Sequence, residues 1–170
     1  MTTKEAKWVT DIVRDAGGTI VGRTRLQKVG FLLELAGVGE GFTFSYRHYG
    51  PYSEELATAA RTAVLLKSLE EVECPTTWGG LCSIYSTNTP PRPDVHATRR
   101  QIAHKGAQTN AIQLELVATA LFLAQQGAQD PWAETARRKP EKANVGLAGA
   151  KELYNWLKQL ETLRALPHLG

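Results

Sequence analysis

Apolar residues recur at helical spacing near the start of the chain and then give way to a short β-branched run. Trp8, Ile12 and Val13 fall on one face of residues 4–16, which predicts an amphipathic helix. The run Thr-Ile-Val at 19–21 is long enough for one short edge strand only. The pattern therefore predicts a helix followed by a strand.

A second helix is predicted over residues 25–36, with Thr24 as its N-cap, and most of its surface is apolar. Lys28 falls inside one of the apolar arcs. Two interpretations fit this position. The lysine stem covers apolar surface while its amine reaches solvent, or the amine pairs with a carboxylate or carbonyl of a neighbouring element or partner. In either case we expect this helix to be buried on most sides.

Aromatic and polar residues alternate over residues 42–49, and this period of two predicts a half-buried strand. Gly50-Pro51 ends the strand, and Ser53 is placed to cap a third helix. Residues 69–86 contain two strand-like arms joined by a turn, which predicts a β-hairpin. The order of these elements predicts an α+β, mainly α fold: a winged helix-turn-helix with a β-hairpin wing and a C-terminal helical annex.

Three prolines within residues 89–93 interrupt helix and strand and predict a domain boundary. After it, Asp94 is expected to cap a short basic helix, and the nearly all-apolar residues 113–126 predict a central helix. Asp130-Pro131 opens the next helix as N-cap and first residue. The predicted domains are a winged-helix domain, 1–89, a Pro-rich basic connector and short helix, 90–106, and the C-terminal helical annex, 107–170.

Charge and cysteine content add few constraints. The net charge of +3 is too small to indicate a nucleic-acid binder by itself. The first residues are charged where a signal peptide needs an apolar core, and no apolar run approaches the roughly 18 residues of a membrane span. We therefore expect a cytoplasmic protein without a membrane partner. Cys74 and Cys82 would face each other across the hairpin, which permits a disulfide, but two half-buried thiols are favoured in a reducing cytosol.

Two short motifs carry a family resemblance. The motif residues are Leu26, Gln27, Lys28, Leu32, Tyr49, Gly50, Pro51, Tyr52 and Ser53. With them the chain resembles the YwgA-like proteins and, more distantly, the SocA or Panacea antitoxin domain. The resemblance implies a small intracellular prokaryotic or phage-related protein on a winged-helix scaffold, which binds a partner as an antitoxin, adaptor or regulator.

Nucleic-acid binding is the first functional hypothesis, because winged helices often place their third helix in the major groove. That helix begins with Glu54 and Glu55 here, so its first turn would repel phosphate. We therefore expect backbone contacts from the basic residues Arg23, Arg25, Arg47, Arg92, Arg99, Arg100, Lys105, Arg137, Arg138 and Lys139. Each basic cluster is also compatible with a solvated surface.

Binding of a protein partner is the second hypothesis. Exposed apolar anchors are needed for such an interface, and candidates near the helix–wing edge are Tyr52, Leu65, Leu69 and Trp78. The same side chains would equally fit a core between the wing and the annex. Salt distinguishes the two hypotheses, since phosphate contacts weaken steeply with ionic strength and an apolar interface does not.

The sequence argues against an enzyme. Its four histidines are scattered, and no nucleophile, P-loop or metal-ligand motif is present. No catalytic residue, metal, cofactor or small-molecule substrate is predicted. The sequence thus predicts a non-catalytic regulatory module that contacts nucleic acid in a prokaryotic or phage-related regulatory or defence system. The alternative is an antitoxin-like or adaptor protein that binds a protein partner.

Overall fold

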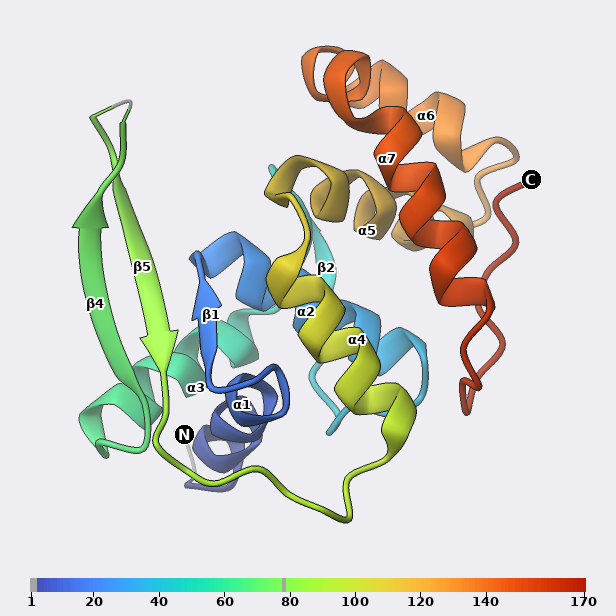
Figure 1. The fold of residues 1–170 in the computed structure, drawn as a ribbon. Coiled ribbons are helices and arrows are strands. Elements are labelled where there is room, and N and C mark those ends of the chain that lie inside the picture. Colours follow the sequence, from blue (N-terminus) through green and yellow to red (C-terminus); the bar gives the residue numbers. More distant parts are fainter. Residues whose placement is uncertain (1–2, 78) are drawn as a thin grey trace.

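The chain folds as an α+β protein that is mainly α-helical (Figure 1), in a computed structural model that describes residues 3–77 and 79–170. The elements of the first half are α1 (Thr3–Asp15), β1 (Thr19–Val21), α2 (Arg23–Leu35), β2 (Ser45–Arg47), β3 (Gly50–Tyr52), α3 (Glu54–Leu65), β4 (Glu70–Pro75) and β5 (Leu81–Ser86). Those of the second half are α4 (Ala97–Gln108), α5 (Ala111–Gln125), α6 (Pro131–Arg138) and α7 (Pro140–Lys158).

Helix α2 lies at the centre of the fold, as its apolar surface predicts. Helices α4 and α5 and strand β3 pack against it, and nine of its thirteen residues are buried. One hydrophobic core runs from α1 and α2 through α4 and α5 to α7. The residues after the proline-rich segment therefore complete the core around α2, while the predicted domain boundaries stay predictions.

Strands β1, β5 and β4 form an antiparallel sheet in that order, so β1 and the predicted hairpin are both confirmed. Val21, Ile84 and Val72 lie side by side across the three strands. Cys74 pairs with Cys82 in the hairpin register, and both are free thiols. None of the helices in the described ranges is long and apolar enough to cross a membrane.

The predicted strand over residues 42–49 is wrong in its extent. Only β2 is a strand there, and it pairs with β3 in a small separate hairpin. The backbone N–H groups of residues 41–43, which precede β2, donate to side-chain carboxylates instead. Glu34 accepts bonds from Gly41 and Phe42, and Glu55 accepts one from Thr43. Because these amides bond to side chains, they are not available to a β ladder.

Helix starts follow the expected chemistry at two positions and differ at two. Ser53 caps α3 by accepting from Leu56 N–H at 3.1 Å, and Asp130 caps α6 in front of its proline. Thr24, by contrast, lies inside α2, which starts from Gly22 without a side-chain cap. Asp94 is not a cap either: His96 takes that position at α4 and accepts from the N–H of the second helical residue.

Candidate functional site

The motif residues of α2 bind the segment that enters α3. Gln27 donates to Ser53 O at 2.9 Å and accepts from Ser53 N–H at 2.8 Å, so one side chain satisfies both backbone groups of a buried residue. Such groups would be costly to bury unpaired. We call the contacts of Gln27 and Lys28 with β3 and Ser53 the α2–β3 clamp.

Lys28 completes the clamp. It is 1% exposed, and its amine donates to Pro51 O at 2.8 Å, so the interpretation with an amine in solvent is wrong and pairing with a neighbouring carbonyl is confirmed. Burial lowers the pKa of Lys28 to about 7; the carboxylate of Glu115 opposes this shift, and the cations of Lys139 and Lys142 add to it.

Gly50 is required by the same clamp for two reasons. Its φ is +90°, a region that L side chains avoid, and a Cβ there would lie 2.4 Å from Thr119 Oγ1 on α5. Tyr49 of the motif is exposed, and the motif residues that hold α2, β3, α3 and α5 together are Gln27, Lys28, Gly50, Pro51 and Ser53. The spacing of these residues is set by the packing of α2 against β3 and the start of α3.

A second buried cluster uses one of the cations predicted to bind nucleic acid. Lys139 is 8% exposed; its amine lies 2.9 Å from Glu115 Oε2 and donates to His48 O at 2.9 Å. Lys142 also pairs with Glu115, at 2.8 Å. The prediction that Lys139 contacts nucleic acid is therefore wrong, because its charge is neutralised inside the fold.

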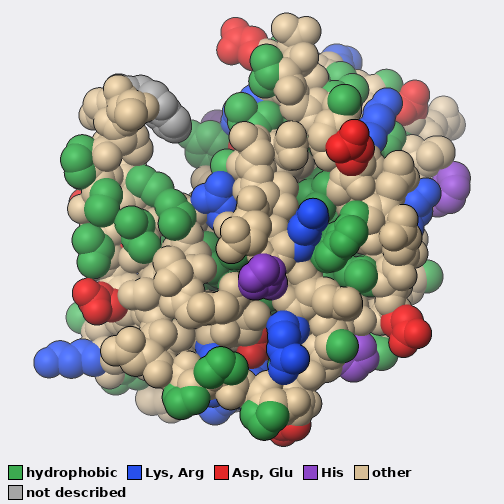
Figure 2. All heavy atoms as spheres, in the orientation of Figure 1, with side chains coloured by type: hydrophobic (Ala, Val, Ile, Leu, Met, Phe, Trp, Pro, Cys, Tyr) green, Lys and Arg blue, Asp and Glu red, His purple; other side chains and the backbone are tan. Residues whose placement is uncertain are grey.

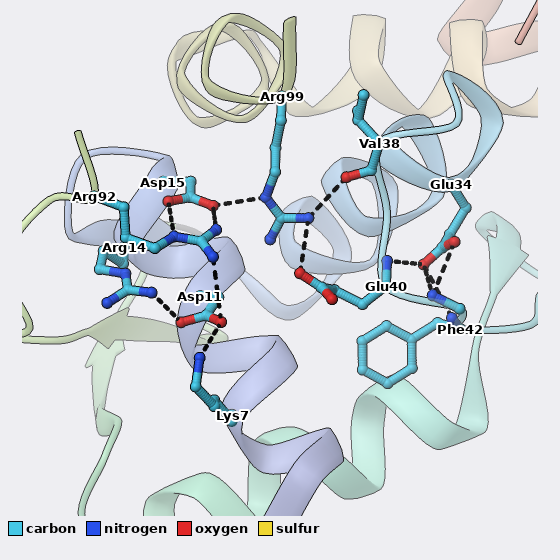
Figure 3. Close-up of polar contacts among 11 residues, drawn as sticks. Lys7, Asp11, Arg14, Asp15, Glu34, Val38, Glu40, Phe42, Arg92 and Arg99 are labelled. Atoms are coloured by element: carbon cyan, nitrogen blue, oxygen red, sulfur yellow. Dashed lines mark hydrogen bonds and ion pairs between the residues drawn. The ribbon is translucent and has the colours of Figure 1, made fainter. Parts of the chain in front are cut away.

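Arg99 is likewise an interior residue, and its predicted role is wrong (Figure 3). It is 4% exposed; its Nε donates to Asp15 at 2.6 Å and its Nη1 to Val38 O at 2.9 Å. Arg92 also pairs with Asp15, which raises the pKa of Arg92. Residues 95–114 around Arg99 contain no acidic side chain, and its partner Asp15 lies on α1, 84 residues earlier in the chain. No local sequence pattern predicts this contact.

Other predicted cations are engaged with neighbours at the surface. Arg23 pairs with Glu71 at 3.0 Å, and Arg25 donates to Thr109 O at 3.1 Å. Hydrogen bonds from Arg137 and Arg138 lower the pKa of Glu134 to about 2. Three of the ten predicted residues are exposed and form no ion pair within the described residues: Arg47, Arg100 and Lys105.

The four residues predicted to contact a protein differ in placement. Leu69 is 3% exposed and belongs to the core, so of its two predicted placements, a partner contact and a core position, it has the core position. Leu65 is 81% exposed, and Tyr52 is half-buried under the guanidinium of Arg47. Trp78 lies outside the described residues.

The β4–β5 hairpin extends beyond the helices and carries exposed apolar side chains. Figure 1 shows its upper half standing clear of the helices, and Figure 2 shows hydrophobic side chains gathered along it. Val21 is 40% exposed, Val72 45% and Leu81 70%. Val21 on β1 and Val72 on β4 flank Ile84 on one face of the sheet, whereas Leu81 lies on the other face, and an exposed apolar face of this kind indicates a contact surface.

A groove of about 730 Å³ lies between this hairpin and the helices. Its walls come from β1, the distal halves of β4 and β5, and the starts of α2 and α5, with lining residues that include Val21, Arg23, Arg25, Glu73, Leu81 and Asn110. Figure 2 shows the molecule hollowed between the hairpin and the helical body. Sequence patterns could not show this groove, because residues around 21–25, 73–83 and 110–111 are brought together only in the fold.

No family model, curated protein or solved structure matches this chain. The resemblance to the YwgA-like and SocA or Panacea proteins therefore stays a prediction. Within the described residues, no group of three or more His, Cys, Asp or Glu side chains is arranged to hold a metal ion.

Proposed function

We propose that this chain is a non-catalytic module of the winged-helix type that binds a protein partner through its β4–β5 hairpin. The order α1, β1, α2, α3 and hairpin, with β1 completing a three-stranded sheet, supports the winged-helix assignment. The role is that of an adaptor or an antitoxin-like regulator, in keeping with the family resemblance.

The observation that carries this proposal is the exposed apolar face of the sheet, where Val21 and Val72 flank the half-buried Ile84. The cations proposed for nucleic acid offer less support, because Arg99 and Lys139 are buried in ion pairs. Acidic side chains also line the hairpin and would repel phosphate, including the exposed Glu70 and Glu73. A protein partner therefore fits the surface better than DNA or RNA.

The test is site-specific photocrosslinking in the native cells. A photoreactive residue replaces Val72 on the hairpin, and a matched variant carries it at Val145, an exposed apolar residue of α7. We expect one discrete protein adduct from position 72 and none from position 145. Val72→Lys should abolish co-purification of the same protein, whereas Val145→Lys should not.

Salt dependence separates the two partner classes. The isolated complex should persist between about 50 and about 200 mM salt, since an apolar interface releases few counterions. A mixed-sequence DNA duplex and a single strand serve as comparison ligands. Binding of either that collapses over this range, together with the absence of a protein adduct, would overturn the proposal in favour of nucleic acid.

A further inference from the structure

We propose that the partner contributes an extended segment, which adds as a strand to the free edge of β5 at Leu81, beyond the last β5 residue that bonds to the β1 side. This inference rests on the proposed function and specifies its binding mode. The segment would lie in the 730 Å³ groove, in line with β1, between the hairpin and the first turn of α2.

The hydrogen bonds to β4 fix which way the β5 backbone points. Thr76 N–H donates to Gly80 O at 2.8 Å, which makes this a hydrogen-bonded pair of the antiparallel ladder. Such pairs alternate with non-bonded pairs along a ladder. Cys82 therefore bonds toward β4, and the N–H and C=O groups of Leu81 and Ser83 point to the opposite edge.

The β1 side confirms this direction and shows where pairing ends. Gly22 N–H donates to Ser83 O at 2.7 Å. The chain then leaves the sheet, because Gly22 O accepts from Leu26 N–H at 3.1 Å as the first bond of α2. Among the backbone hydrogen bonds of the described residues, Ser83 N–H and both groups of Leu81 have no partner on this edge.

The other exposed edge of the sheet is a poor template. The outer edge of β4 carries Glu70 and Glu73, and it ends in Pro75, which has no N–H to donate. Charges and proline are common ways in which edge strands avoid further pairing. The edge of β5 has none of these features, since Leu81, Cys82 and Ser83 are uncharged and retain their N–H groups.

The groove also indicates the chemistry of the segment. Its apolar contacts are Val21 and Leu81, which lie on opposite faces of the sheet and therefore favour apolar side chains on both faces of the segment. Near α2 it holds the guanidinium of Arg25, which forms no ion pair among the described residues and lies beside a helix start without a side-chain cap. Arg23, by contrast, is already paired with a glutamate of β4, and Glu73 lines the groove near the hairpin. We therefore expect an extended segment with apolar residues on both of its faces and a carboxylate at the end near Arg25 and the start of α2.

The experiment selects ligands without assuming a sequence. Random peptides of about eight residues, long enough to span such a strand, are displayed on phage and selected on the purified full chain. We expect enriched peptides to show consecutive apolar residues and the acidic end. On binding, a synthetic copy should slow amide hydrogen exchange at Leu81 and Ser83.

Two matched controls test the backbone contact itself. Leu81→Pro removes an N–H that points into the groove but leaves β4 pairing intact, whereas Leu81→Thr keeps that N–H. We expect the proline variant to bind the peptide about tenfold more weakly than the threonine variant, a loss typical of one interfacial hydrogen bond. Methylating the peptide nitrogens that face β5 should have the same effect, and methylating the alternate nitrogens should not.

The outcomes separate this mode from the proposed function. Failure to enrich any peptide, or protection that maps elsewhere, overturns strand addition. If the crosslinked protein partner then still binds Leu81→Pro with unchanged affinity, the proposed function stands and only the mode is wrong. If no protein adduct forms from position 72, the proposed function itself fails.

Discussion

Several buried polar side chains around α2 are hydrogen-bonded, whereas some backbone groups in the distal half of the hairpin have no partner among the described residues. In the interior, Gln27 and Lys28 satisfy backbone groups of the segment that enters α3, and Arg99 is held by Asp15. At the hairpin, backbone groups of Leu81 have no partner on the groove side among the described residues. The difference separates groups that build the fold from groups that are free to contact another molecule.

The largest effect is expected where a buried ion pair is broken. Arg99→Met leaves Asp15 buried with a single partner, the half-buried Arg92. We expect the free energy of unfolding to fall by about 3 kcal/mol, as for other buried pairs that lose one member. Urea denaturation measures this loss. Arg100→Met, one residue on but exposed, should change it by less than about 0.5 kcal/mol. Equal effects would contradict the interior role of Arg99.

A slightly smaller effect is expected from the glycine of the clamp. Gly50→Ala places a Cβ against Thr119 in a backbone conformation with φ +90°, so we expect a loss of about 2 to 3 kcal/mol in the free energy of unfolding. Gly79→Ala is the matched control, because its φ of +89° is similar but nothing lies within 4 Å of the added Cβ. Only the strain, about 1 kcal/mol, should appear there. If the two alanine variants lose the same free energy of unfolding, Thr119 of α5 does not restrict the space at Gly50.

Lys28 gives the interior a distinct pH dependence. Its pKa is about 7 in the fold and 10.5 in its ordinary state, so the unfolded chain binds more protons at pH values between these two. The contribution of Lys28 to the free energy of unfolding therefore rises with pH between about 7 and 10.5. Below pH 7 the buried amine is charged and the full cost of burying that charge applies. Relative to Lys28→Met, the wild type should gain about 2 kcal/mol in free energy of unfolding between about pH 7.5 and about pH 9.5. Parallel pH curves for the two proteins would contradict a buried, perturbed amine.

Local patterns in the sequence predict the elements well and the polar contacts poorly. The apolar surface of residues 25–36, the cap at Ser53 and the hairpin over residues 69–86 follow from short-range chemistry, and all three are confirmed. Arg99 and Lys139 look like surface cations, because their carboxylate partners lie far away in the chain. The groove cannot be predicted for the same reason: it exists only once three segments that are distant in the chain are brought together.

The smallest effect on the free energy of unfolding is expected at the hairpin surface, because the comparison predicts that its exposed side chains contribute little to stability. Val72 is 45% exposed on β4, and its neighbours across the sheet are apolar. Val72→Lys should therefore change the free energy of unfolding by less than about 0.5 kcal/mol in urea, since it removes little buried area and buries no charge. The same substitution should raise the protein concentration at which the isolated chain precipitates, because it interrupts an exposed apolar surface. A loss as large as that of Arg99→Met would instead mean that Val72 is part of the core, and the hairpin would then no longer stand as a surface kept free for a partner.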